Sequence, residues 1–123
     1  MAQDSHHLLT PDPIAFAREC GDPGPCARYV ALWLTEKGVP GAPRLRTILR
    51  DWRRMGVEAA VAHWCERMGL LPCAAAPGAV ALVTQPAGDP VFGVLASQEV
   101  FVTRSFSRVL IVKNPQIIKA WRV

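Results

Sequence analysis

The chain of 123 residues is poor in charge and lacks long runs of one residue type. Only 20% of the residues are charged while 50% are hydrophobic, which excludes wholesale disorder. The longest apolar run, residues 70–83, is broken by Pro72, Pro77 and Gly78, so no segment reaches the roughly 20 residues that span a bilayer. The formal net charge of +4 includes no long basic run, and we expect no nucleic-acid partner.

The N-terminal residues lack the basic and then apolar pattern of a secretory signal. We therefore expect a soluble chain made in a cytoplasm, where thiols stay reduced. The four cysteines include no C-x-x-C pair, so we expect no zinc site and no other cofactor. An iron–sulfur cluster is the alternative, because four thiolates can hold one. Its ligands would be the pair that flanks a Pro/Gly loop and the pair that flanks a helix end, namely Cys20, Cys26, Cys65 and Cys73.

Eleven prolines and nine glycines divide the chain into short elements. A polar arm covers residues 1–12, and a single domain covers residues 13–123. Within the domain, Asp12 as an N-cap before Pro13, apolar periodicity and glycine stops predict helices over residues 13–20, 26–37, 43–55 and 57–68. Turn residues then separate predicted strands over 78–84, 91–96, 99–104 and 108–112, followed by a short helix over 114–119. Helices followed by an antiparallel sheet predict an α+β fold.

The third and fourth predicted helices are joined by a single glycine and should form an antiparallel hairpin. The apolar stripe of the third helix places Leu45, Ile48, Leu49 and Trp52 inside. Its outer face is either a solvated surface or a docking surface for partners, since interfaces concentrate arginine and tryptophan. Trp121 is expected either to pin the C-terminal tail to the domain or to anchor a neighbour. The arginines of the outer face are Arg46, Arg50, Arg53 and Arg54.

A cysteine at the start of a helix is the main chemical clue in the sequence. A Pro/Gly loop precedes Cys26, and a helix N-terminus lowers the pKa of a thiol from about 8.5 toward 7 or below. A cysteine hydrolase also needs a general base within hydrogen-bond reach of the sulfur. The chain offers three histidines for this role: His6 and His7 in the polar arm, and His63 at the side of an apolar helix stripe.

Several short motifs occur in an order that resembles a known family. They are the loop before Cys26, the two helices after it, the strands with Gly78–Val80 and Gly93–Val94, and the closing Ala120–Val123. In this order they resemble small phage tail-region proteins that are related to NlpC-type cell-wall peptidases. The resemblance runs from residue 13 to residue 123 and implies a papain-like fold. In the active peptidases, this fold cleaves peptide cross-links of peptidoglycan with a cysteine nucleophile.

The resemblance places the family's catalytic residues on positions that this chain has mostly changed. Cys26 matches the nucleophile, the histidine base falls on Val91, and the acidic residue of a Gly-Asp-Val strand falls on Ala79. The orienting polar residue would lie near residues 101–104, where no histidine or carboxamide occurs. Cys26 is therefore predicted to be a vestigial nucleophile, with His63 as its base only if the chain is active.

The resemblance leads to two main hypotheses about function. The first is a structural component of a bacteriophage or phage-like tail, present in the virion near the tail tip. It implies contact with the hub and distal tail proteins and several copies in a symmetric assembly. The alternative is an active peptidoglycan-cleaving cysteine peptidase or amidase that uses Cys26. A chaperone that assists tail assembly and then departs is a third hypothesis.

Overall fold

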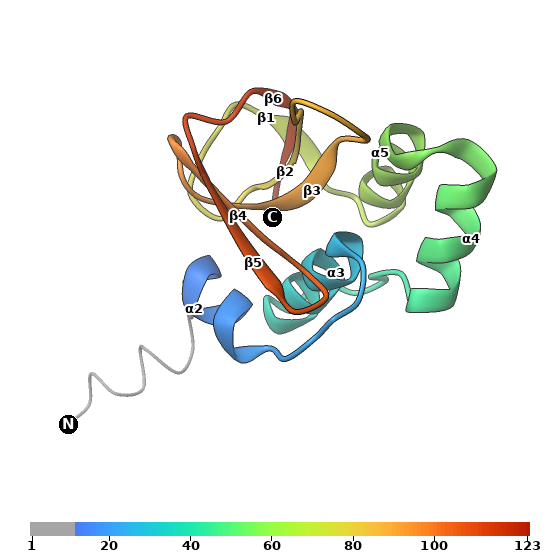
Figure 1. The fold of residues 1–123 in the computed structure, drawn as a ribbon. Helices are drawn as coiled ribbons and strands as arrows, with labels where there is room; N and C mark the ends of the chain where they lie inside the picture. Colours follow the sequence, from blue (N-terminus) through green and yellow to red (C-terminus); the bar gives the residue numbers. More distant parts are fainter. Residues whose placement is uncertain (1–11) are drawn as a thin grey trace.

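The computed structural model describes residues 12–123, which form four helices and six strands (Figure 1). As the sequence predicts, Asp12 caps the first helix: its Oδ1 accepts hydrogen bonds from the N–H groups of Ile14 and Ala15 at 2.8 and 2.9 Å. None of the four helices combines the length and apolar character that crossing a bilayer requires. The helices are α2 (Pro13–Glu19), α3 (Cys26–Glu36), α4 (Leu45–Met55) and α5 (Val57–Arg67). The strands are β1 (Leu71–Cys73), β2 (Val80–Val83), β3 (Val91–Ser97), β4 (Val100–Ser105), β5 (Arg108–Lys113) and β6 (Ile117–Arg122).

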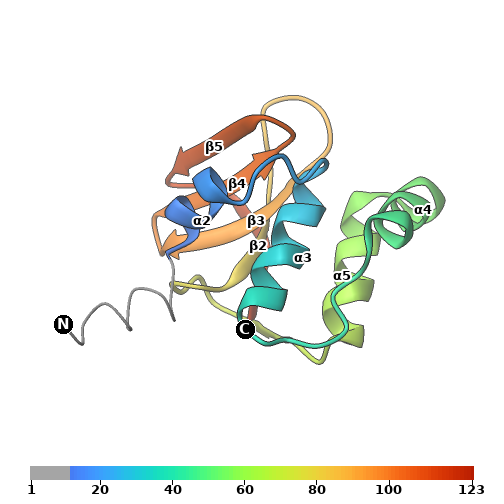
Figure 2. The ribbon, with the colours of Figure 1, turned by 90° about the horizontal axis from the view of Figure 1, so that it is seen from below.

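The six strands form one antiparallel sheet in the order β1-β6-β2-β3-β4-β5. Helices α2 and α3 pack on one face of this sheet, chiefly against β3 and β4 (Figure 2). Helices α4 and α5 form a lobe beside α3 (Figures 1 and 2). Helices precede the sheet along the chain, which confirms the predicted α+β class.

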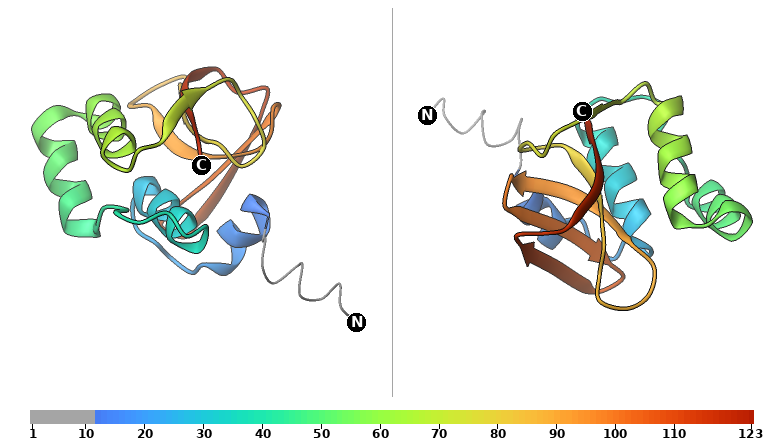
Figure 3. Two further views of the ribbon diagram at one scale, coloured as in Figure 1. Left: turned by 180° about the vertical axis from the view of Figure 1, so that it is seen from behind. Right: turned by 90° about the horizontal axis from the view of Figure 1, so that it is seen from above.

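Alternating side chains of the sheet contribute to two separate apolar clusters. The larger lies between the sheet and the helices and includes Tyr29, Trp33 and Phe92. The smaller lies on the other face, where the curled sheet (Figures 1 and 3) surrounds small residues together with Leu95 and Phe101. The helices therefore build the main core against one face of the sheet, and the candidate nucleophile Cys26, on α3, belongs to this core.

The C-terminal segment is a strand, so the helix predicted over residues 114–119 is wrong. Asn114, with a φ of 51°, turns the chain, and β6 then pairs with both β1 and β2. The β-branched Ile117 and Ile118 favour this extended form. Strand β1 was not predicted from the sequence, because Pro72 argues against a strand. Strand β1 lies at the edge of the sheet, where proline is tolerated because its missing N–H need not pair with a neighbouring strand.

Helix α4 presents a different face to the protein than its sequence predicts. The buried residues of α4 are Ile48 and Asp51, whereas Leu45 and Leu49, which were expected inside, are 39% and 45% exposed. The reason is that α4 packs mainly on α5 and α3, which cover only a narrow stripe. Gly56, with a φ of 83°, joins α4 directly to α5. Figures 1 and 2 show the two helices crossing steeply, so the predicted antiparallel hairpin is wrong.

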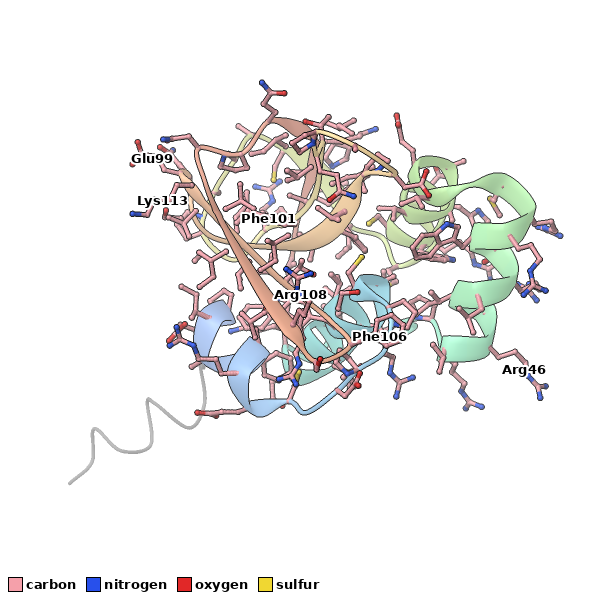
Figure 4. The ribbon with its side chains drawn as sticks, viewed as in Figure 1. Arg46, Glu99, Phe101, Phe106, Arg108 and Lys113 are labelled. Atoms are coloured by element: carbon pink, nitrogen blue, oxygen red, sulfur yellow. The ribbon has the colours of Figure 1, made fainter. Side chains whose placement is uncertain are left out.

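The turn between β4 and β5 is fastened to the N-terminal helices. The N–H of Phe106 donates a hydrogen bond to the carbonyl of Gly24 at 2.7 Å. Arg104 donates from Nη1 to the carbonyl of Ala17 at 2.9 Å and from Nε to the carbonyl of Phe106 at 3.0 Å. Figure 4 labels Phe106 and Arg108 in this turn, next to α3. These bonds fix the loop that precedes α3 and thereby the start of that helix.

Candidate functional site

Cys26 lies at the first position of α3, as the sequence predicts. The loop before it is ordered locally, because Oδ1 of Asp22 accepts a hydrogen bond from the N–H of Gly24 at 2.9 Å. Pro25 precedes the helix and provides no side-chain cap, and its carbonyl accepts a hydrogen bond from the N–H of Arg28 at 2.9 Å. The site thus has the cysteine placement of a helix-start nucleophile.

The environment of the Cys26 sulfur disfavours its charged form. The residue is only 6% exposed and belongs to the main core. Burial raises the pKa of this thiol, and the backbone amides of Phe92 and Ala27, which favour the thiolate, do not offset it. No ionisable side chain of residues 12–123 contributes to the shift. At neutral pH the thiol is therefore protonated and shielded from solvent.

The strand opposite Cys26 presents Phe92 rather than the residue that the resemblance singled out. Cys26 and Phe92 share the main core, and the backbone of Phe92 hydrogen-bonds toward the sulfur. Val91, the position that matches the catalytic histidine, packs with the second cluster on the other face of the sheet. Side chains alternate along a strand, so the two neighbours face opposite sides. The main core that contains Cys26 therefore meets the face of β3 that carries Phe92, not the face that carries Val91.

The polar residues at the predicted orienting position serve the backbone. Thr103 is 1% exposed, and its Oγ1 donates a hydrogen bond to the carbonyl of Phe92 at 2.7 Å. Arg104 is engaged with the end of α2 and with the β4–β5 turn, as described above. Neither side chain holds an imidazole in place. Both stabilise the packing of β4 on its neighbours.

None of the described interactions brings a histidine to Cys26. His63 is exposed on α5, where it lines a small groove together with Asp51 and Trp64. It forms no hydrogen bond with any residue of the described chain, and its position beside the buried stripe of α5 is the flank that the sequence predicts. His6 and His7 lie outside the described residues.

The four cysteines are free thiols in different parts of the molecule. Cys26 and Cys65 are buried in the main core, whereas Cys73 packs with the second cluster on the opposite face of the sheet. Cys20 follows the end of α2, and its thiol lies 3.3 Å from the carbonyl oxygen of Gly21. Within residues 12–123, no group of three or more Cys, His, Asp or Glu side chains is arranged to hold a metal ion.

The four predicted arginines of α4 do lie together. With Leu45 and Leu49 they line a groove of about 730 Å³ on the outer side of the helix. Figure 4 shows Arg46 pointing away from the rest of the molecule. Among residues 12–123, one ion pair forms, between Nε of Arg50 and Oδ1 of the buried Asp51 at 3.0 Å. The structure therefore places a cluster of cations around two exposed leucines, and the sequence predicted the arginines but not the leucines.

Trp121 is a core residue and is not available to a neighbour. It is 3% exposed, and its ring meets that of Phe92 edge to face at a centroid distance of 6.4 Å. Strand β6 lies between β1 and β2, and the side chain of Trp121 belongs to the main core. Of the two expected roles, it pins the end of the chain, and its prediction as a partner-binding residue is wrong.

A buried carboxylate links α4 to α5 and was missed in the sequence. Nε1 of Trp64 donates a hydrogen bond to Oδ2 of Asp51 at 2.8 Å. This bond and the one from Arg50 lower the pKa of Asp51, and they outweigh the opposing effect of desolvation. The available signal was a single acidic residue among the arginines of the helix, next to the apolar Trp52.

No protein-family model, curated protein or solved structure matches this chain. The family resemblance therefore remains a prediction from the sequence.

Proposed function

We propose that this chain is a non-hydrolytic structural subunit of a phage or phage-like tail, built on a papain-like, NlpC-type scaffold. The observation that carries the non-hydrolytic part is the buried Cys26 sulfur: the residue is 6% exposed, lies in the main core and is protonated at neutral pH. A cysteine hydrolase needs a thiolate and a proton donor for the leaving amine. Here the sulfur has neither access to solvent nor an imidazole partner in the described chain.

The arrangement around Cys26 supports the idea of a scaffold that has lost its chemistry. A cysteine at a helix start, packed on an antiparallel sheet, is the placement that the resemblance implies. The position that would provide a base holds Val91, which packs with the second cluster, and the region of the orienting group holds a threonine bonded to the backbone. The tail location, near the hub and distal tail proteins, rests on the resemblance alone.

Two measurements on the wild-type chain and Cys26→Ala test this proposal. Mass spectrometry of purified tail particles should find the chain at a fixed ratio to the other tail proteins. Incubation with peptidoglycan should release no more peptide fragments than the Cys26→Ala variant does, because Cys26 performs no catalysis. Absence of the chain from particles would contradict the tail assignment.

The alternative of an active peptidase makes the opposite prediction in the same assay. Wild-type chain would then release muropeptide fragments, and Cys26→Ala would abolish the release. His63→Ala is the matched second variant, because His63 is exposed and its replacement leaves the core intact. Activity that depends on both residues would overturn the non-hydrolytic proposal.

A further inference from the structure

The positive charge of the chain is concentrated on one helix. Residues 44–55 contain five arginines and one aspartate, and their net charge of +4 equals that of the whole chain. The remainder of the molecule is therefore neutral overall. The aspartate is the buried Asp51, which pairs with Arg50, so the other exposed arginines of α4 have no compensating anion on the helix.

Several features of α4 are unfavourable for an isolated helix. Arg44 stands at the N-cap without a side-chain hydrogen bond, and no acidic residue lies in the first turn. Cations at a helix N-terminus oppose the helix dipole. Arg46, Arg50 and Arg54 repeat at intervals of four residues, where like charges repel each other. The fold offers no ion pair to Arg46, Arg53 or Arg54 within residues 12–123.

The apolar side of α4 is also incompletely covered. Its buried residues are Ile48 and Asp51 alone, and its 11 residues fall short of the about 12–15 at which isolated helices become stable in water. Leu45 and Leu49 lie one turn apart between the arginines and line the groove with them. A partner that covers these leucines and neutralises the arginines would remove both unfavourable features at once.

We infer that α4 is the docking surface for an acidic amphipathic helix of another protein subunit. Such a helix places apolar residues on the two leucines and carboxylates beside the four arginines of the groove. Arginine with flanking apolar residues is characteristic of protein interfaces. This inference rests on the proposed structural role and names the chemistry of its partner.

The same groove is a poorer match for nucleic acid. Arginine can contact phosphates and guanine, but stacking on bases would require exposed aromatic rings. The groove is lined by leucine and arginine only. Two exposed leucines at its centre gain nothing from contact with phosphates. Binding of nucleic acid is therefore the competing result, and the test below includes a DNA duplex to detect it.

The test uses the full chain and a synthetic helical peptide of about 20 residues, with leucines one turn apart between flanking glutamates. The comparison ligands are a glutamine peptide, in which every glutamate is replaced by glutamine, and a DNA duplex. Binding is measured by fluorescence anisotropy for the wild-type chain, Arg46→Glu/Arg53→Glu, Leu49→Ala and the control Arg122→Glu on β6. Circular dichroism checks that each variant is folded.

We expect the acidic peptide to bind at least about tenfold more tightly than the glutamine peptide. Its binding should weaken when the salt concentration rises from about 0.05 to about 0.5 M. The double arginine variant should lose at least about tenfold in affinity and Leu49→Ala about threefold, whereas Arg122→Glu should change it less than about twofold. Equal binding of the two peptides, or tighter binding of the duplex, would overturn the inference. These binding measurements test neither hydrolysis nor the presence of the chain in particles. The proposed function is therefore tested by separate measurements, and its failure can be told apart from failure of this inference.

Discussion

The Cys26 thiol is subject to two opposing influences. The start of α3 favours a thiolate through the helix dipole and the free N–H groups, whereas burial in the core favours the neutral thiol. Burial is the larger influence on its pKa. Cys26 therefore has the placement of a reactive cysteine at a helix start but the surroundings of an inert core residue.

Cys65 provides a pH-dependent test of how strongly the core excludes charge. Burial raises the pKa of this thiol to about 12, against about 8.5 in an unfolded chain. The unfolded state then loses its proton first, so stability falls as pH rises above about 8.5. Between about pH 7 and about pH 10, the free energy of unfolding of Cys65→Ala should fall by about 2 kcal/mol less than that of the wild type. Urea unfolding at the two pH values measures this; equal losses would contradict it.

Asp51 and Trp64 make a second prediction at the level of single residues. Asp51→Ala leaves the Nε1 donor of the buried Trp64 without a partner and should destabilise the chain by about 1–3 kcal/mol. Asp51→Asn keeps an acceptor but loses the charge. Because the pKa of Asp51 is lowered by folding, the wild type should exceed Asp51→Asn in stability at neutral pH. That advantage should fade as pH falls below about 4, and a constant difference in urea unfolding would rule out the charge contribution.

At the scale of elements, α4 depends on very few residues for its attachment. Ile48 is fully buried, and its neighbour Leu49 is 45% exposed. Ile48→Ala should therefore cost about 2–5 kcal/mol, whereas Leu49→Ala should cost no more than about 0.5 kcal/mol. Chemical denaturation of the two variants compares buried and exposed faces with matched chemistry. A larger cost for Leu49→Ala would mean that the leucines lie inside.

Local patterns predicted the elements that depend on local signals. The Asp12 cap, the start of α3 at Cys26 and the strands around Val80 and Val91 follow from capping, glycine stops and turn residues. The fate of Asn114–Arg122 could not be predicted locally, because β6 is stabilised by pairing with strands far away in the sequence. The buried face of α4 could not be predicted locally either, because the positions of α5 and α3 decide which side of the helix is covered.

At the scale of the whole molecule, the catalytic interpretation depended on which side of β3 each residue faces. Sequence matching placed the lost base at Val91, but the pleat of the strand turns Phe92 toward Cys26. The separation of Cys73 from Cys26 and Cys65, across the two faces of one sheet, is likewise a property of the assembled fold. The molecule combines a buried sulfur with a cationic helix on its outside; the proposed non-hydrolytic role rests on the first feature and the proposed docking surface on the second.

The rate at which iodoacetamide modifies Cys26 in the native chain tests the central claim most directly. Peptide mass spectrometry at about pH 7.5 would give this rate alongside those of N-acetylcysteine and of the same chain unfolded in urea. Because Cys26 is 6% exposed and its thiol is protonated, we expect it to react at least about 100-fold more slowly than N-acetylcysteine in the native chain. In urea, Cys26 should react at nearly the rate of N-acetylcysteine. A native rate above that of N-acetylcysteine would show an activated thiolate and would contradict the account.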